Sequence, residues 1–141
     1  MSNNPERFAS LAPLILRLVV GVIFVAHGAQ KLFGLFGGPG LQAVADMFGQ
    51  MGFTPGIFWA ALVGATEFVG GLGLIAGLLT RWAALGLAIT MAVAVVKVHW
   101  ASGLFAQNGG FEYPLTLLAV SIALLIRGAG PLSLDGLRKK A

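Results

Sequence analysis

The chain contains no cysteine, and only 10% of its 141 residues are charged. The missing cysteine excludes disulfides, thiol relays, cysteine-ligated iron–sulfur clusters and covalent haem attachment through the usual cysteine motif. The charged fraction is well below that of a soluble domain. The few basic residues are scattered through apolar sequence and form no basic face, so we expect no nucleic-acid partner.

Hydrophobic residues make up most of what is present, at 57% of the chain with a mean hydropathy of +0.90. A chain of this length has room for one domain, here residues 1–141. The composition predicts an integral membrane protein whose main partner is the lipid bilayer. In such a protein, each ionisable residue inside an apolar run marks a candidate functional site.

The apolar runs predict four membrane-spanning helices that form an up-down bundle of the all-α class. Gly37-Gly-Pro-Gly40 and Thr54-Pro-Gly56 enclose a short amphipathic segment at about 41–52, which we expect to lie at the membrane surface. Thr80-Arg81 is short enough only for a tight turn. The four spans are expected at about 11–36, 57–79, 82–100 and 112–127, followed by a basic tail at 128–141.

Four spans place both termini on the same side of the membrane. That side would carry Arg7, Arg17, Arg81, Arg127, Arg138, Lys139 and Lys140, against Lys31 and Lys97 on the other. The positive-inside rule then predicts cytoplasmic termini in a bacterial inner membrane. We expect Arg17, at the inner end of the first span, to extend to anionic lipid headgroups.

One face of the first span combines small and ionisable residues. Arg17, Gly21, Phe24, Gly28 and Lys31 follow one another at spacings of 4, 3, 4 and 3, which places them on one side of a helix. The other three spans repeat this combination. Small residues let helices approach closely in lipid. We therefore predict that these faces meet along the bundle axis and surround a polar pocket in its outer half.

Glu67 lies about ten residues from either end of the second span, or about 15 Å, which places it near the bilayer centre. An unpaired charge there costs roughly 2.5–3.5 kcal/mol, so the carboxyl must be protonated, paired or hydrated. His27 lies at a similar depth, and Lys31 lies one turn further out. We predict a catalytic cluster of these three residues. The alternative is a neutral Glu67, hydrogen-bonded to a helix, that serves only assembly.

Four residues near the outer boundary are candidate ligand contacts: Lys97, His99, Glu112 and Tyr113. Lys97 shares the small-residue face of the third span or extends to the headgroups. His99 points away from that face if the helix continues, which favours an interfacial imidazole. Glu112 caps the fourth span, or it is drawn with Tyr113 into the bundle mouth because that span is short. No pattern of residues predicts a metal site.

The chain resembles the DoxX family of small bacterial membrane proteins. The motifs that carry this resemblance are His27-Gly-Ala-Gln-Lys-Leu-Phe-Gly34, Glu67-Phe-Val-Gly-Gly71, Gly77-Leu-Leu-Thr-Arg-Trp-Ala-Ala84, Lys97-Val-His99, Gly109-Gly-Phe-Glu-Tyr-Pro-Leu115 and Ser133-Leu-Asp135. The resemblance implies the four-helix topology. It also implies a link to redox chemistry, because family members are associated with thiosulfate:quinone oxidoreduction or described as oxidoreductases and as partners in membrane redox complexes.

Three functions remain open at this point. The first is the membrane subunit of a redox system, in which His27 or Lys31 hydrogen-bonds a quinone carbonyl and Glu67 passes protons. Paired haem ligands would have to be His27 and His99, whose faces and depths match poorly, so electrons would come from a partner protein or a bound reductant. The second is a non-catalytic assembly or stress-response scaffold. The third is a small proton-coupled carrier, which at this size would need to form a homo-oligomer.

Overall fold

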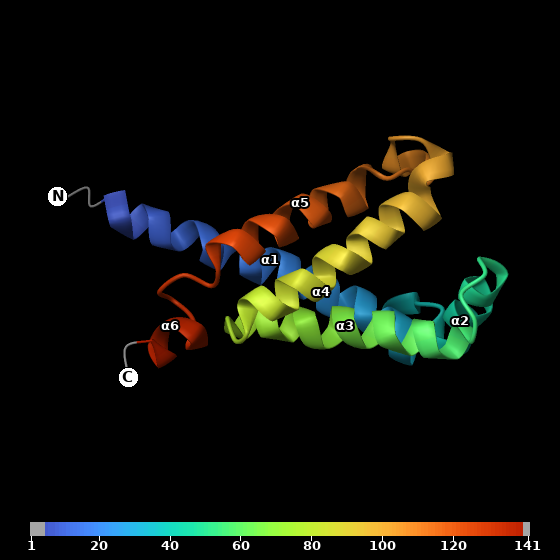
Figure 1. Cartoon of the computed structure of the whole chain (residues 1–141), viewed down its shortest axis with the longest axis horizontal. Helices are drawn as coiled ribbons and strands as arrows, with labels where there is room; N and C mark the ends of the chain where they lie inside the picture. Colours follow the sequence, from blue (N-terminus) through green and yellow to red (C-terminus); the bar gives the residue numbers. More distant parts are fainter. Residues whose placement is uncertain (1–4, 140–141) are drawn as a thin grey trace.

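The computed structural model describes residues 5–139, and every regular element in that range is helical (Figure 1). Glycine and proline separate the main helices. The six α-helices are α1 (Pro5–Phe33), α2 (Gly40–Gln50), α3 (Gly56–Ala76), α4 (Thr80–Val93), α5 (Glu112–Arg127) and α6 (Leu134–Arg138). A π-helix (Ala94–His99) continues α4, and short 3₁₀ turns occur at Leu35–Gly37, Trp100–Ser102 and Ala106–Asn108.

Within the described residues, three helices are long and apolar enough to cross a membrane: Phe8–Phe33, Gly56–Ala76 and Thr80–Ser102. This confirms the prediction of an all-α membrane protein. α5 has 16 residues, which corresponds to about 24 Å and is shorter than a typical hydrocarbon core of about 30 Å. The fourth crossing therefore stays a prediction.

α1 begins at Pro5, before the expected residue 11, and the turn expected at Thr80-Arg81 lies at 77–79, so that Thr80 begins α4. At the C-terminal ends of α1 and α3, glycine explains the difference from the predicted position. The span expected at 11–36 is helical only to Phe33, because Gly34 adopts a left-handed conformation with φ 66°. α3 ends at Ala76, because Gly77, also at φ 66°, caps it through its N–H. The predicted surface segment forms α2 two residues shorter than expected at its C-terminal end, and α5 coincides with the span expected at 112–127.

The predicted small-residue faces bring α1 and α3 into direct backbone contact. A Cβ atom on Gly28 would lie 2.5 Å from the backbone nitrogen of Phe68, and one on Gly71 would lie 2.7 Å from the carbonyl oxygen of Gly21. Only glycine allows such an approach. These contacts confirm that the α1 and α3 faces serve close helix packing.

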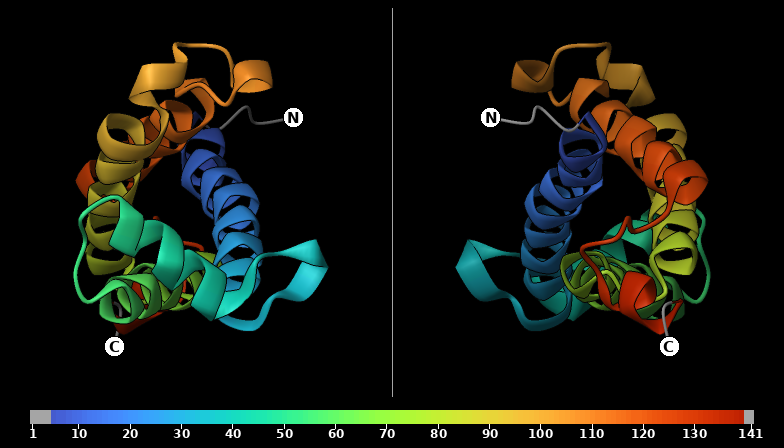
Figure 2. Two further views of the ribbon diagram at one scale, coloured as in Figure 1. Left: turned by 90° about the vertical axis from the view of Figure 1, so that its right-hand side faces the viewer. Right: turned by 90° about the vertical axis from the view of Figure 1, so that its left-hand side faces the viewer.

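The helices form two groups that diverge from a common end (Figures 1 and 2). α1 packs along α3, and α4 packs along α5. We call the two ends of the molecule the α6 end and the α2 end, after the short helix that each carries. Between the groups lies a hydrophobic core of Val20, Phe24, Leu74, Ala84, Leu87, Met91, Leu117 and Leu124.

The structure corrects the prediction for Arg17. Its side chain is 1% exposed and does not extend to lipid headgroups. The guanidinium donates through Nε to the Leu74 carbonyl at 3.0 Å, through Nη2 to the Leu132 carbonyl at 3.0 Å, and through Nη1 to the Ala129 carbonyl. The carbonyls at a helix C-terminus carry partial negative charge that suits a cation. Arg17 therefore joins α1, the end of α3 and the segment that follows α5.

The C-terminal segment also folds back instead of forming a simple basic tail. The Asp135 carboxylate accepts hydrogen bonds of 2.9 Å from the backbone N–H groups of Leu79 and Thr80, at the start of α4. Its own N–H donates to the Gly77 carbonyl at 2.9 Å. Partial burial by itself raises the pKa of Asp135, but the two donated hydrogen bonds outweigh it and hold this pKa below its ordinary value. The α6 end is thereby closed by hydrogen bonds from the tail.

Candidate functional site

A cavity of about 670 Å³ lies between α1, α3, α4 and α5 towards the α2 end. Its size falls within the range of small-molecule sites, about 300–1,000 Å³. Most of its wall is apolar. The polar side chains on it are His27, Lys31, Thr66, Glu67, Thr90, His99 and Tyr113.

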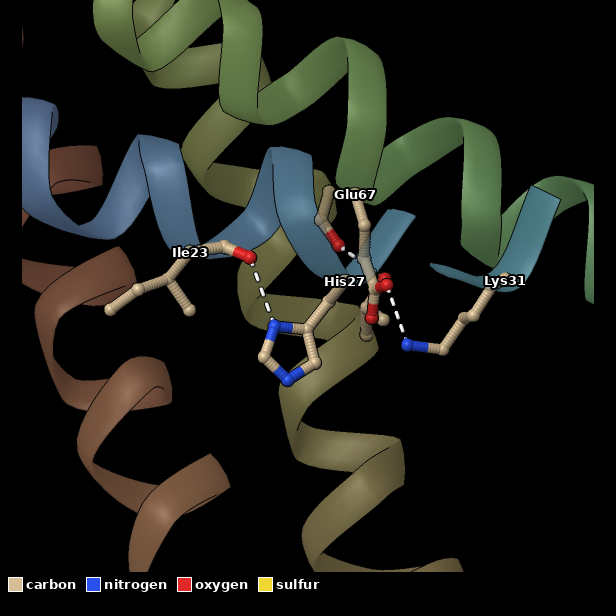
Figure 3. A network of polar contacts seen from close by, with 6 residues as sticks. Ile23, His27, Lys31 and Glu67 are labelled. Atoms are coloured by element: carbon tan, nitrogen blue, oxygen red, sulfur yellow. Dashed lines mark hydrogen bonds and ion pairs between the residues drawn. The ribbon is translucent and has the colours of Figure 1, made fainter. Parts of the chain in front are cut away.

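An ion pair lies on the wall formed by α1 and α3 (Figure 3). Lys31 Nζ is 2.7 Å from Glu67 Oε2, and the Glu67 side chain is 2% exposed while that of Lys31 is 22% exposed. Glu67 lies eleven residues into α3, which is about 16 Å along a helix that is long enough to span a membrane. A buried carboxylate at that depth needs a partner, and Lys31 supplies it.

His27 lies beside this pair and presents one ring nitrogen for further contacts. Its Nδ1 is 2.9 Å from the carbonyl oxygen of Ile23. Because a carbonyl oxygen only accepts hydrogen bonds, Nδ1 carries the hydrogen and Nε2 keeps a lone pair in the neutral ring. The ring is half-buried, lines the cavity and lies 6.2 Å from the ring of Tyr113, centre to centre. Neutral His27 can therefore accept a proton or a hydrogen bond through Nε2.

The π-helix changes which residues of the third span reach the cavity. His99, expected to point away, lines the cavity, and its Nδ1 is 2.7 Å from the Gly109 carbonyl oxygen. Lys97 is exposed and does not belong to the lining residues. A π-helical turn closes its hydrogen bonds over five residues, so the side chains beyond it are displaced by about one position, or about 100°, relative to an α-helix. The α-helical placement of His99 was wrong for this reason.

Tyr113 and Glu112 lie at the start of α5 but act differently. Tyr113 lines the cavity, whereas Glu112 does not. Glu112 Oε1 accepts a 2.7 Å hydrogen bond from the backbone N–H of Ala106, which lines the cavity. Of the four candidate ligand contacts, the structure thus places Tyr113 and His99 on the cavity wall. Glu112 supports the loop that covers the cavity, and Lys97 lies outside.

Several lining residues were not predicted. Thr66, which precedes Glu67 on α3, is one of them. Thr90 belongs to the predicted small-residue face of the third span, lines the cavity and donates through its hydroxyl to the Gly86 carbonyl at 2.9 Å. At the α2 end the cavity is lined by the apolar side chains of Met47, Phe48, Met51, Phe53 and Trp59. The amphipathic pattern of α2 indicated a surface helix, but no local signal showed that its apolar side covers a cavity.

The residues that the structure describes contain no group of three or more His, Cys, Asp or Glu side chains that could hold a metal ion. The polar groups on the wall are the two imidazoles, the Lys31–Glu67 pair, the Tyr113 hydroxyl and the hydroxyls of Thr66 and Thr90, set in an apolar surface. This combination suits hydrogen bonding and proton exchange with an organic molecule.

Residues 12–100 match the DoxX family model. The chain belongs to the DoxX family. A relative from Bacillus subtilis bears the name "Putative oxidoreductase CatD" and is 32% identical over 125 residues, which cover 89% of this chain and 85% of the relative. An uncharacterized protein of Haemophilus influenzae is 34% identical over 137 residues (94% of this chain, 95% of the relative). No solved structure matches the chain.

An uncharacterized membrane protein of Mycobacterium tuberculosis is 34% identical over 136 residues, covering 86% of this chain and 78% of the relative. The name of this relative agrees with the membrane-spanning helices found here. The region that matches the DoxX model includes His27, Lys31, Glu67 and His99, whereas Tyr113 lies beyond it. The Arg17 contacts described above connect this DoxX region to the C-terminal segment.

Proposed function

We propose that this DoxX-family protein is the membrane subunit of a quinone-linked redox system and that its cavity holds the quinone headgroup. The observation that carries the proposal is the Lys31–Glu67 ion pair, buried beside His27 on the wall of a cavity in the membrane-spanning part of the chain. The proposal includes four membrane crossings, with both termini on the cytoplasmic side of a bacterial inner membrane.

The groups on the wall fit a quinone headgroup. Such a headgroup is a flat apolar ring with an oxygen at each end, so it needs apolar walls and hydrogen-bonding groups near its oxygens. The Lys31 ammonium and the Tyr113 hydroxyl can donate to a carbonyl oxygen, and neutral His27 can accept from a hydroxyl through Nε2. The wall therefore suits both the oxidised and the reduced headgroup.

The residues of the site can hold and move protons. A bound quinone supplies the redox chemistry, in which the headgroup takes up or releases two electrons and two protons. His27 Nε2 exchanges a proton at the cavity wall, and Glu67, held by Lys31, is the second acceptor, at mid-depth. Because the chain has no cysteine for an iron–sulfur cluster, we propose that electrons arrive from a partner protein. The name of the Bacillus subtilis relative, "Putative oxidoreductase CatD", supports a redox role.

Binding can be measured through Trp59. The chain has three tryptophans, and Trp59 lines the cavity whereas Trp82 and Trp100 do not. In the variant Trp82→Phe/Trp100→Phe, reconstituted into lipid nanodiscs, a long-chain benzoquinone should quench Trp59 fluorescence saturably. Lys31→Met should weaken binding by about tenfold to a hundredfold, as expected for loss of a charged hydrogen bond of about 1.5–3 kcal/mol.

Lys97→Met is the matched control, because it removes the same charge outside the cavity. Because Lys31→Met also leaves Glu67 without its partner, the double variant Lys31→Met/Glu67→Gln is tested beside it. Absence of saturable quenching, or equal affinities of the Lys31 and Lys97 variants, would refute the proposal. Glu67→Gln alone should fold and abolish quinone-linked activity of membranes that contain the protein and its partner. Full activity of that variant would instead support a scaffold role.

A further inference from the structure

The wall of the cavity between α3 and α4 is exposed to the surroundings of the protein. Leu62 on α3 and Ile89 and Val93 on α4 line the cavity, and their side chains are 46%, 58% and 41% exposed. A residue that both lines a cavity and is exposed lies where the cavity meets the outside. These residues therefore mark an opening in the side of the molecule, which we call the α3–α4 opening.

The packing of α3 and α4 explains why the opening lies where it does. From the turn that joins them, the helices approach at Gly73 and Ala83, then at Gly70 and Leu87, and then at Thr66 and Gly86. Towards the α2 end the helices diverge (Figure 1), and both line the cavity, α3 with Leu62 and α4 with Ile89. The Thr66–Gly86 contact thus forms the closed end of the opening.

The depth of the opening places it against lipid chains. Leu62 lies six residues into α3, or about 9 Å from the helix start, and Ile89 lies ten residues before His99, or about 15 Å. Both depths fall within one leaflet of a hydrocarbon core of about 30 Å. The residues of the opening, Leu62, Ile89 and Val93, are all apolar, so they offer a hydrated ion no group that would replace its water.

At the α2 end the cavity is lined by apolar side chains. Phe48 lies 5.8 Å from Phe53, and Phe53 lies 6.0 Å from Trp59, measured between ring centres, and all three line the cavity. Met47 and Met51 of the same segment line it as well. Met47 is 41% exposed, so the cavity also meets the outside at this end, between rings and thioethers, and the α3–α4 opening is the one that faces lipid chains.

We propose that the cavity is filled sideways from the bilayer through the α3–α4 opening, and that its ligand is a membrane-dissolved amphiphile whose apolar chain stays in that opening. Inside the opening, the buried Glu67 with Lys31 and His27 forms the polar end of the cavity. A compact polar head fits the polar end of the cavity, and a long apolar chain fits the apolar opening that faces lipid. The class of head, a quinone, rests on the proposed function, whereas the lateral route does not.

The route can be tested without any quinone, by the rate at which an introduced thiol is labelled. The chain has no native cysteine, so an introduced cysteine is the one thiol that reacts. Thr66→Cys places a thiol at the closed end of the opening, and Ile122→Cys is the matched control. Ile122 also lies ten residues into its helix and is exposed, but it is not a lining residue. Both thiols are reacted in nanodiscs with an N-alkyl maleimide that partitions into lipid and with a sulfonated maleimide that does not.

The lipid-soluble reagent should label both cysteines, and the sulfonated reagent should label neither. Adding Ile89→Trp, which narrows the opening, should slow labelling at Thr66→Cys by about tenfold or more, equivalent to about 1.4 kcal/mol of added barrier, and leave Ile122→Cys unchanged. Leu62→Cys, at the rim, serves as a second reporter if Thr66→Cys does not fold. Faster labelling of the Thr66 variant by the sulfonated reagent, or no effect of Ile89→Trp, would overturn the lateral route.

The nature of the ligand is tested with the Trp59 reporter described above. A benzoquinone with an isoprenoid chain should quench Trp59 at lower membrane concentration than the same headgroup without a chain, and Ile89→Trp should slow its binding. Equal binding of the two compounds, unaffected by Ile89→Trp, would overturn the proposed amphiphile and leave the quinone function standing. No quenching by either compound would refute the quinone function, and the maleimide experiment would still decide the route.

Discussion

Removing Lys31 should destabilise the folded protein by an amount that depends on pH. Lys31→Met keeps the length of the side chain but leaves the Glu67 carboxylate, 2% exposed, without the ammonium that lies 2.7 Å away. Loss of one partner of a buried ion pair costs about 3–5 kcal/mol, because the remaining charge is both desolvated and unpaired. The penalty should therefore exceed that of any surface lysine.

Protonation sets an upper limit to this penalty. A carboxyl group with an ordinary pKa of about 4.3 is neutralised at pH 7 for about 3.7 kcal/mol, since each pH unit corresponds to about 1.36 kcal/mol. In Lys31→Met, Glu67 can take up a proton at that cost, so the loss of stability at pH 7 should not exceed about 4 kcal/mol. As the pH falls towards 5, the cost of protonation falls, and the difference between variant and parent should shrink by about 1.4 kcal/mol per pH unit.

The measurement is the free energy of unfolding in bicelles, obtained by steric trapping at several pH values. Lys97→Met is the control, because Lys97 is exposed and lies outside the cavity, and a surface change of this kind usually stays within about 0.5 kcal/mol. The double variant Lys31→Met/Glu67→Gln should recover part of the loss, because no buried charge remains to be paired. Equal stability of Lys31→Met and Lys97→Met at pH 7, with no dependence on pH, would refute the reasoning.

Three further predictions concern the packing and closure of the helices. Asp135→Ala should cost about 0.5–2 kcal/mol at pH 7 in the same unfolding assay, as for loss of a helix cap. Because the folded-state pKa of Asp135 is lowered, this contribution to stability is complete above about pH 4 and is lost as the pH falls through the folded pKa. Equal acid sensitivity of variant and parent would contradict this prediction. Gly28→Ala should separate α1 from α3 and cost at least about 1–3 kcal/mol, whereas Gly49→Ala, whose added Cβ meets no atom within 4 Å, is the tolerated control in a thermal aggregation assay. Arg17→Met should remove three hydrogen bonds to carbonyls and lower the melting temperature far more than Arg81→Met, which removes an exposed guanidinium with one such bond.

The helices and their packing faces could be predicted because their signals are local. Apolar runs of sufficient length, interrupted by glycine and proline, indicate where membrane helices begin and end. The 3.6-residue period places Gly28 and Lys31 on one face of α1 and Gly71 and Glu67 on one face of α3. Because both faces are rich in small residues, the contact between them could be predicted. In the structure this contact places Lys31 against Glu67 across the interface.

The placement of His99 could not be predicted, because it depends on a change of hydrogen bonding within a continuous helix. The residues of the π-helix, Ala94–His99, carry no sequence signal that distinguishes them from an α-helix. One wide turn is enough to exchange Lys97 for a histidine on the cavity wall. The tilt of α4 away from α3, on which the opening at Leu62 depends, is equally a property of the assembled helices.

The sequence alone determined that this is an all-α membrane protein of the DoxX family, with a buried acid on its second apolar helix. Composition, period and motif suffice for this, because each depends on residues that are neighbours along the chain or on one helix. Only the tertiary structure decided the role of Arg17, whose acceptors are backbone carbonyls 57, 112 and 115 residues away. Every residue has a carbonyl group, so no side-chain pattern can mark those acceptors, and their position depends on how the helices are packed.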